Sequence, residues 1–305
     1  MRVLATRWIL LTVGFLALVV MGGTAPVIPA AGSVHRRDAS PVAVLADAAI
    51  VESSGLAASG RTPGELWTHN DSGDGPILYA TDRDGRARGR FAVTAAVNVD
   101  WEDMAAAAGA GGEPALYVAD IGDNARARDD LVVYRVAEPA VAPRADPPDL
   151  APVATAPAER FPFVYPDRHH DAESLLVDPR TGEMLVVTKE AFGGASLYRF
   201  PEPLTPGEAA TLAAVGRAAL PGVLPATGGA VSPDGSRLVL RTYATAYEWP
   251  VAPGQSLAAA LAGRPRRLVL PSVPQGEAIA YRADGRALLF TSEGSPCPLH
   301  EVIVS

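Results

Sequence analysis

The feature that most constrains the fold of this chain is a short segment that recurs five times, each time followed by a turn and a second β-rich segment. Its copies are Ser54–Ala57, Glu102–Ala105, Glu173–Leu176, Gly228–Val231 and Glu277–Ala280. Measured from the third position of each copy, the intervals are 48, 71, 55 and 49 residues. A period of about 50 residues with four strands per unit is the spacing of β-propeller blades.

Turn signals between the segments indicate antiparallel strands. Asp178-Pro-Arg-Thr-Gly182, Pro233-Asp-Gly235 and Ala283-Asp-Gly285 are hairpin sequences rather than long crossovers. Third strands are predicted at residues 77–81, 131–136, 196–200, 246–249 and 299–304, and fourth strands at 89–94, 159–164, 216–220 and 266–270.

The fifth repeat has no fourth strand of its own. Val42–Ala46, which precedes the first repeat, can pair with the last repeat and close the ring without leaving a long exposed edge. We therefore predict an all-β, five-bladed propeller over residues 42–305. A sixth blade within the 71-residue interval is disfavoured, because Ala140–Pro157 is rich in Pro and Ala and has no strand pattern.

Two long connections have helical signals. Thr205-Pro-Gly-Glu208 has the pattern of a capping box with proline at the first helical position, and Ser256–Leu261 is followed by Gly263. We expect both helices between the third and fourth strands of their blades.

The N-terminus predicts export. Two arginines within Met1–Arg7 precede a largely apolar run, Trp8–Met21, and Ala30 and Ala31 offer a cleavage site. The run of about 14 residues is shorter than the roughly 20 that span a bilayer, which favours a signal peptide at 1–31 over an uncleaved anchor. Residues 32–41 are then a linker, and the protein is expected to be secreted or extracytoplasmic, or held at the membrane by its N-terminus.

The charge of the chain limits its partners. A net charge of −8 and the absence of a long basic run argue against nucleic acid. Contact with a membrane is expected through the N-terminal segment alone, if it stays uncleaved. The remaining partners are a small molecule or a protein at the propeller rim.

Acidic residues recur where the blades begin. In an antiparallel pair, the start of the first strand and the end of the second meet at the same rim of the central channel. Glu102, Glu173 and Glu277, with Ser54, therefore surround one mouth, to which the fourth blade contributes Thr227 and Gly228. Turn chemistry explains isolated loop carboxylates, but it does not explain a Glu repeated at strand starts.

Other polar residues of the strand ends and blade openings join the same rim. They include Asp71, Asp100, Asp120, Asp171, Lys189 and Arg241. Converging carboxylates raise one another's pKa unless a cation neutralises them. Oxygen ligands at flexible spacing suit Ca²⁺ better than zinc or copper.

This arrangement resembles the calcium-activated nucleotidases, or apyrases. That family has a five-bladed ring with calcium on the axis and one Ser or Glu per blade. The matching positions here read Ser54, Glu102, Glu173, Gly228 and Glu277, and Leu66-Trp-Thr-His-Asn-Asp-Ser-Gly73 is similar to the family's first-blade strand and acidic turn. Gly228 departs from the pattern, so the resemblance implies that Thr227 or a water substitutes there.

A second resemblance names no activity. Asn70-Asp-Ser-Gly73, Asp100-Trp-Glu-Asp103 and Asp120-Ile-Gly-Asp-Asn124 are similar to sequences in a group of exported bacterial propeller proteins. Because propellers host many reactions, the fold alone does not identify one.

Three functions stay open. The first is hydrolysis of phosphate esters or anhydrides at a predicted calcium site formed by Ser54, Glu102, Glu173, Thr227 and Glu277. Asp100 or Asp171 would then act on the attacking water, and the candidates for substrate contact are Lys189, Arg241, Asp71 and Asp120.

The second is a non-catalytic ring that binds a ligand or protein, and the third is a glycosidase. The glycosidase needs an aromatic platform, for which Trp101 is the obvious candidate. Serine hydrolysis and zinc proteolysis are disfavoured, because the chain has neither Gly-x-Ser-x-Gly nor His-Glu-x-x-His. Cys297 is the single cysteine, so no disulfide can form within the chain.

Overall fold

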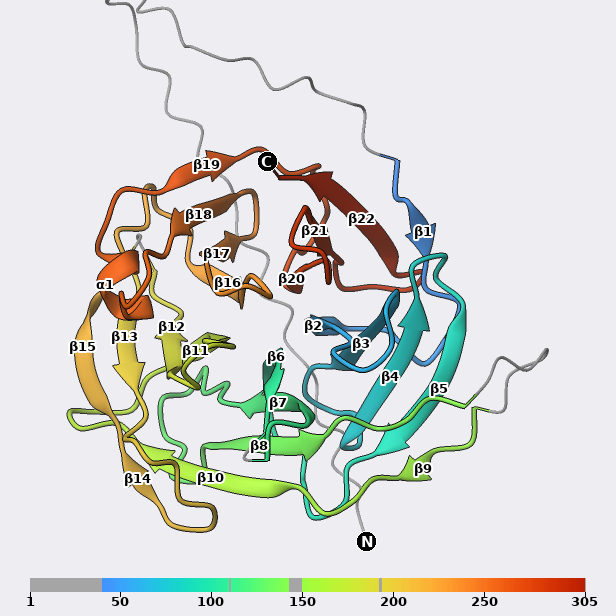
Figure 1. Ribbon diagram of the computed structural model, residues 1–305, viewed down its shortest axis with the longest axis horizontal. Helices are drawn as coiled ribbons and strands as arrows, with labels where there is room; N and C mark the ends of the chain where they lie inside the picture. The colour runs from blue at the N-terminus through green and yellow to red at the C-terminus, as the bar shows by residue number, and fades with distance from the viewer. Residues whose placement is uncertain (1–39, 110, 143–149, 192–193, 305) are drawn as a thin grey trace, which may run out of the picture. The chain divides into compact units, whose positions relative to one another are not determined.

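The computed structural model describes residues 40–304 except residues 110, 143–149 and 192–193. The predicted signal segment and most of the predicted linker lie outside the described residues. Within the part that is described, the chain forms five β-sheets around a central axis (Figure 1). The five-bladed propeller predicted from the sequence is confirmed.

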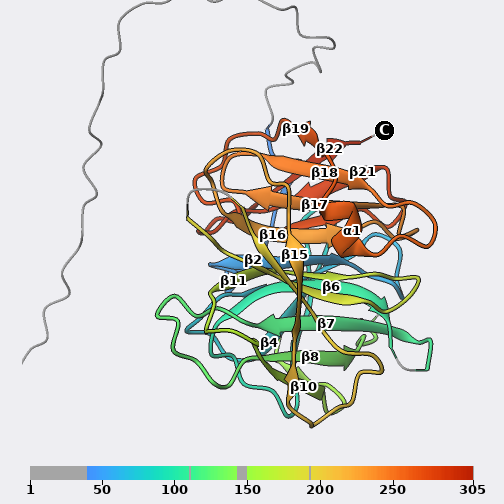
Figure 2. The same cartoon turned by 90° about the vertical axis from the view of Figure 1, so that its left-hand side faces the viewer.

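Each blade starts with its innermost strand. The first two blades are β2 (Ser53–Ala58), β3 (Glu65–Asn70), β4 (Ile77–Asp82) and β5 (Ala87–Ala92), then β6 (Trp101–Ala108), β7 (Pro114–Asp120), β8 (Val132–Ala137) and β10 (Glu159–Val164). The next two are β11 (Ala172–Val177), β12 (Met184–Thr188), β13 (Ser196–Arg199) and β15 (Ala213–Arg217), then β16 (Ala226–Val231), β17 (Arg237–Thr242), β18 (Ala246–Pro250) and β19 (Arg266–Leu268). The last is β20 (Ile279–Tyr281), β21 (Ala287–Phe290), β22 (Pro298–Ile303) and β1 (Ala43–Val44). Figure 2 shows β6, β7, β8 and β10 of the second blade stacked in order from the axis outward.

The ring is closed by the N-terminal strand, as predicted. β1 pairs antiparallel with β22 through Ala43 opposite Leu299 and Val44 opposite Pro298. The backbone N–H groups of Val42 and Leu45 donate to the carbonyl oxygens of Leu299 and Cys297, at 2.8 and 2.9 Å. The last blade is therefore built from both ends of the described chain.

The hydrophobic core is divided among the five interfaces between blades. Alternate residues of each first strand face opposite neighbours. Leu56 thus packs with Leu289 and Leu299 of the fifth blade, whereas the adjacent Ala57 packs with Leu116 and Val118 of the second. Because each interface has its own core, the blades hold one another in place around the axis.

Two predictions about the connections need correction. Residues 205–208 form a turn rather than a helix, because Gly207 has a left-handed φ of 83° and its N–H donates to the carbonyl of Arg160 at 2.7 Å. The chain continues into β14 (Ala210–Thr211), which pairs in parallel with β10. Within the stretch 140–157, expected to lack strands, β9 (Val153–Ala154) pairs in parallel with β5.

The other predicted helix is confirmed. It is α1 (Leu257–Leu261), capped by Ser256, whose hydroxyl accepts from the N–H of Ala259. Its Leu257 and Leu261 complete the core between the third and fourth blades. Among the described residues, no helix combines the length and apolar character needed to cross a membrane.

Candidate metal centre at the acidic mouth

A β-bulge at the start of the first strand recurs in four blades. The register between first and second strands shifts between Ser53 and Gly55, Trp101 and Asp103, Ala172 and Ser174, and Ala226 and Gly228. The bulged residues are thus Ser54, Glu102, Glu173 and Thr227. A bulge redirects a side chain out of the normal alternation of a strand. The same local geometry therefore places four of the five predicted metal ligands.

The bulges also settle the alignment of the fourth blade. The sequence repeat matched Gly228 to Ser54, Glu102 and Glu173, and this match was wrong by one residue. Thr227 occupies the bulge, and a Cβ on Gly228 would overlap the carbonyl oxygen of Glu277. The polar side chain that the repeat lacked in this blade is therefore supplied by Thr227.

The hydroxyl residues are oriented by neighbouring blades. Ser54 donates to the carbonyl oxygen of Glu102 at 2.7 Å, and Thr227 donates to that of Gly276 at 2.9 Å. A hydroxyl that donates its hydrogen keeps its lone pairs available. Glu277 lies beside Ser54, whose Oγ is 3.3 Å from one Glu277 carboxylate oxygen.

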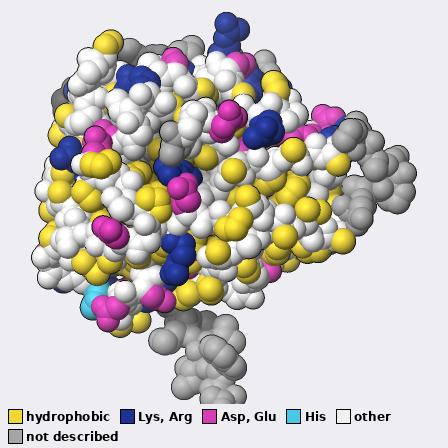
Figure 3. Space-filling model, turned by 60° about the horizontal axis from the view of Figure 1, so that its bottom comes forward, with side chains coloured by type: hydrophobic (Ala, Val, Ile, Leu, Met, Phe, Trp, Pro, Cys, Tyr) yellow, Lys and Arg dark blue, Asp and Glu magenta, His cyan; other side chains and the backbone are white. Residues whose placement is uncertain are grey.

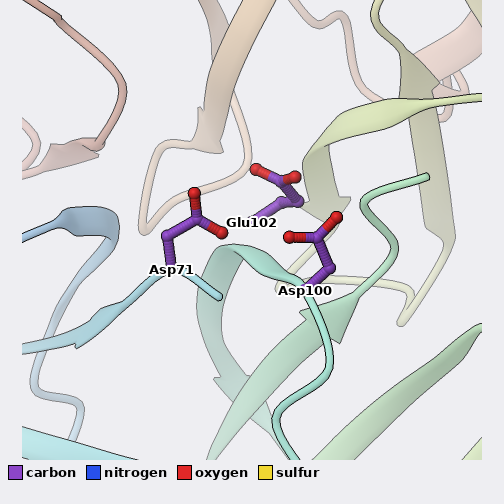
Figure 4. A group of neighbouring side chains, drawn as sticks. All are labelled: Asp71, Asp100 and Glu102. Carbon is purple, nitrogen blue, oxygen red and sulfur yellow. The ribbon is translucent and has the colours of Figure 1, made fainter. Parts of the chain in front are cut away.

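Residues that flank the first and second strands complete the cluster. Asp71 follows β3, whereas Asp100 and Asp171 immediately precede β6 and β11. Asp71, Asp100 and Glu102 form one triad, and Glu102, Asp171 and Glu173 form another; within each, one potential ligand atom per residue lies within 4.8 Å of the others. Figure 4 shows the first triad, with the carboxylates of Asp71, Asp100 and Glu102 facing a common space between the first and second blades.

Glu102, which belongs to both triads, is the most unusual of these residues. Its side chain is buried, with 3% of the residue exposed, yet no donor among the described residues makes a hydrogen bond to its carboxylate. Burial, together with the negative charges of Glu173 and Asp71, raises the pKa of Glu102 well above its usual range. A buried carboxylate in this condition is costly unless something else neutralises it.

The pKa values of other carboxyl groups at this mouth are raised as well. Burial, aided by Asp100 and Glu277, raises the pKa of Asp71 to about 7. Burial also raises the pKa of Glu173 to about 8, although Lys189 opposes the shift. Glu293, at the same mouth, has its pKa raised to about 8 by burial and by Glu277. Carboxyl groups with pKa values this high are partly or largely protonated at neutral pH, and a bound cation can displace their protons.

Gly122 allows the carboxylates to approach the main chain. A Cβ at this position would overlap carboxylate oxygens of both Glu102 and Asp100. Next to it, the N–H of Asp123 donates to Asp171 at 2.9 Å. Gly122 was not among the predicted site residues, although a glycine two residues after β7, between Ile121 and Asp123, is a signal for close backbone approach.

The four predicted substrate contacts have different surroundings. Lys189 forms an ion pair with Glu173 and its side chain is 22% exposed, so it faces the mouth. Asp71 belongs to the first triad. Asp120 is buried, pairs with Arg128 at 2.8 Å and accepts from the N–H of Asp100 at 3.0 Å, which places it beneath Asp100 rather than at the opening.

Arg241 lies in the wall between the fourth and fifth blades. It is 1% exposed and donates to the carbonyl oxygens of Ala278 and Thr291, both at 2.8 Å. Its guanidinium lies 4.9 Å from the centre of the Phe290 ring, and burial lowers its pKa to about 9. This setting favours a structural role, and its predicted contact with substrate stays a prediction.

Asp103 closes the floor of the acidic mouth. It is fully buried and accepts from the N–H groups of Met104, Leu175 and Gly229, at 2.8, 2.9 and 3.2 Å. These donors come from the second, third and fourth blades. One carboxylate therefore ties three first strands together on the axis, directly below the bulges.

Two residues considered for other chemistry are also buried. Trp101 is 0% exposed and donates through Nε1 to the carbonyl of Val97 at 2.9 Å, so it offers no platform for a sugar. Cys297 is 1% exposed, and burial raises the pKa of its thiol to about 11. Neither residue contributes an accessible group to the mouth.

Basic side chains are dispersed over the face shown in Figure 3. On that face, Lys and Arg lie singly, several of them next to Asp or Glu, and form no continuous field. This distribution agrees with the absence of a long basic run in the sequence.

Comparison with known protein families and with curated proteins found no match. Among solved structures, the chain is similar to a gluconolactonase from Xanthomonas campestris. The two share 14% identity with a TM-score of 0.45, over 83% of this chain and 72% of the other. A likeness at this level concerns the course of the backbone and says nothing about the site.

Proposed function

We propose that the acidic mouth binds a divalent cation, Ca²⁺ by the chemistry of its ligands, and that the cation site serves hydrolysis of phosphate esters or anhydrides. One observation carries the proposal: the buried Glu102 carboxylate accepts no hydrogen bond from the described residues and is shared by two carboxylate triads. A cation would supply the missing charge. The resemblance to apyrases in the sequence supports the same conclusion.

The ligand set fits a hard cation. Glu102, Glu173, Asp71 and Asp100 offer carboxylate oxygens, while Ser54 and Thr227 offer hydroxyl oxygens whose hydrogens are already donated. Calcium accepts six to eight oxygens in flexible geometry, whereas zinc prefers nitrogen and sulfur. Among the described residues, the five carboxylates of the two triads are opposed by the Lys189 ammonium group, which pairs with Glu173, and by the Arg128 guanidinium near Asp100.

Under this proposal, the residues around the site would take the roles that phosphate hydrolysis requires. A bound cation would polarise the phosphoryl group and offset its charge. Lys189 would contact the anionic substrate, because its ammonium group already lies against Glu173 at the mouth. Asp171, fixed by the N–H of Asp123, would orient or deprotonate water; Asp100, held by Asp120, is the alternative.

The cation site is tested by calorimetric titration and by thermal unfolding of metal-free protein. At 100 times its dissociation constant, a ligand of the native state adds about 2.7 kcal/mol. That is about 5–10 °C in melting temperature for a domain of this size. We expect Glu102→Gln to weaken Ca²⁺ binding at least tenfold, and the matched control Glu113→Gln, an exposed residue at the opposite mouth, to bind normally. Equal binding by Glu102→Gln and wild type would refute the site.

Catalysis is tested separately with nucleotides and simple phosphate esters. Asp171→Asn should lose at least 100-fold in turnover while its melting temperature still rises with Ca²⁺. If wild type binds Ca²⁺ but hydrolyses none of these compounds, the hydrolase proposal fails and a non-catalytic binding ring remains.

We also propose that the protein acts outside the cytoplasm, as its N-terminal sequence predicts. Recovery of the protein solely from the cytoplasmic fraction of its native cells would contradict this.

A further inference from the structure

We propose that the opposite mouth of the central channel binds a single unbranched aliphatic chain. A cavity of about 380 Å³ opens there, at the ends of the first strands. Its volume lies within the range of about 300–1,000 Å³ that is usual for small-molecule sites. The site is separate from the acidic mouth and does not depend on the function proposed for it.

All five blades contribute apolar walls to this cavity. They include Ala58 of β2, Ala108 of β6, Val177 of β11, Val231 of β16 and Tyr281 of β20. Pro63, Pro114, Pro179 and Pro233 add apolar surface from the hairpins. Walls that come from every side leave an axial entry, which suits a slim chain better than a protein surface.

The polar side chains in the lining, those of Ser59, Glu138 and Tyr281, are already hydrogen-bonded within the protein. Glu138 accepts hydrogen bonds from Ser59, from the N–H of Gly60 at 3.0 Å and from Trp67 Nε1 at 2.9 Å. The Tyr281 hydroxyl donates to Glu248 at 2.9 Å. With these groups occupied, the cavity favours a ligand whose inserted part has no polar atoms.

Small side chains keep the cavity open. β6 ends in four consecutive alanines, Ala105–Ala108, which are partly or fully exposed although the strand lies next to the axis. Apolar surface that faces water in this way gains free energy when a hydrocarbon covers it.

The inner end of the cavity is closed. Leu56 and Met104, both 1% exposed, lie at its depth. On the side of the acidic mouth, Asp103 holds together the first strands of the second, third and fourth blades. From Glu102 to Ala108 the strand covers about 20 Å at roughly 3.3 Å per residue, so the two mouths are well separated.

The test is titration of the folded protein with primary alcohols from butanol to decanol, whose hydroxyl can stay in solvent at the opening. We expect saturable one-to-one binding by calorimetry. The affinity should rise about fourfold per methylene, since each buried methylene contributes about the same free energy, until the cavity is full. If none of the alcohols binds saturably, the proposal is overturned.

Location is tested by ¹³C-methyl methionine spectra, which need no variant. Met104 lines the cavity, whereas Met184 is buried between the second and third blades outside it. The alcohols should shift the Met104 signal and leave that of Met184 in place. Equal shifts of both signals, or of neither, would contradict the assigned site.

Filling the cavity provides a second test. Ala108→Leu and Ala230→Leu should weaken binding at least tenfold, whereas Ala252→Leu, on an exposed loop, adds the same surface elsewhere and should bind normally. Glu102→Gln should also bind alcohols normally, which separates this site from the metal centre. Retained binding in both filled variants would place the alcohols elsewhere.

Discussion

At the scale of the residue, the acidic mouth depends on one backbone irregularity used four times. The bulges at Ser54, Glu102, Glu173 and Thr227 turn a side chain out of the strand pattern in the same place in four of the five blades. Residues on either side continue normal pairing. A ligand can therefore be exchanged, as Ser or Thr for Glu, without altering the strand that carries it.

Gly122 provides a prediction at this scale. Gly122→Ala should weaken Ca²⁺ binding at least tenfold, because the new Cβ would occupy the space where the Glu102 and Asp100 carboxylates approach the main chain. Calorimetric titration measures the effect. The matched control is Gly111→Ala in the hairpin at the opposite mouth, where a Cβ meets nothing within 4 Å. Wild-type affinity in Gly122→Ala would show that this packing does not matter for the ion.

At the scale of the element, the sequence was most informative where strands repeat. The order of the strands and the closing segment followed from the period and the hairpin turns, and β10 spans the predicted residues 159–164. The prediction of a helix at 205–208 was wrong. The capping pattern gives no indication that Gly207 is left-handed and that its N–H bonds to the carbonyl of Arg160. Parallel strands as short as β9 have no sequence pattern of their own.

The candidate site was predicted in composition but not in detail. Repeated Glu residues at strand starts identified Glu102, Glu173 and Glu277, and strand ends added Asp71 and Lys189. The shift of one residue at Thr227 is invisible in a sequence repeat, because a bulge inserts no characteristic residue. The buried position of Arg241 could not be predicted either, because the carbonyl oxygens that accept its hydrogen bonds come from another blade.

The closing strand gives a prediction at the scale of the element. Leu45→Ala should lower the free energy of unfolding by about 2–4 kcal/mol, because Leu45 is 5% exposed and packs in the core between the fifth and first blades. Val44→Ala, at the exposed residue of β1 that directly precedes Leu45, should change it by about 0.5 kcal/mol or less. Urea unfolding at equilibrium compares the two variants. Equal losses would mean that the strand contributes through its backbone alone.

At the scale of the whole molecule, the pH dependence of stability follows from the acidic mouth. The pKa values of Glu173 and Glu293 are raised to about 8 and that of Asp71 to about 7. Between the usual carboxyl pKa and these values, the folded state binds more protons than the unfolded state, so stability falls as pH rises. His69 and His300, whose pKa values are lowered, have the opposite effect below pH about 6.5.

We therefore expect metal-free protein to lose stability from pH about 6.5 to 8, where the carboxyl groups dominate. Saturating Ca²⁺ should remove this loss, because the ion takes the place of the protons. Urea unfolding across that interval, with chelator and then with Ca²⁺, measures both slopes. A metal-free protein whose stability is flat or rises over the interval would show that the carboxyl groups are not strained as described.

The pairing of β1 with β22 also determines when the fold can be completed during synthesis. Ala43 pairs with Leu299, 256 positions later in the chain, whereas the four other blades form from strands close together in sequence. As the ribosome releases the chain, those blades can assemble in turn, but the fifth must wait for its last strand. Until then, β1 is an unpaired segment of nascent protein. A chaperone that recognises extended segments would have access to it for nearly the whole of translation.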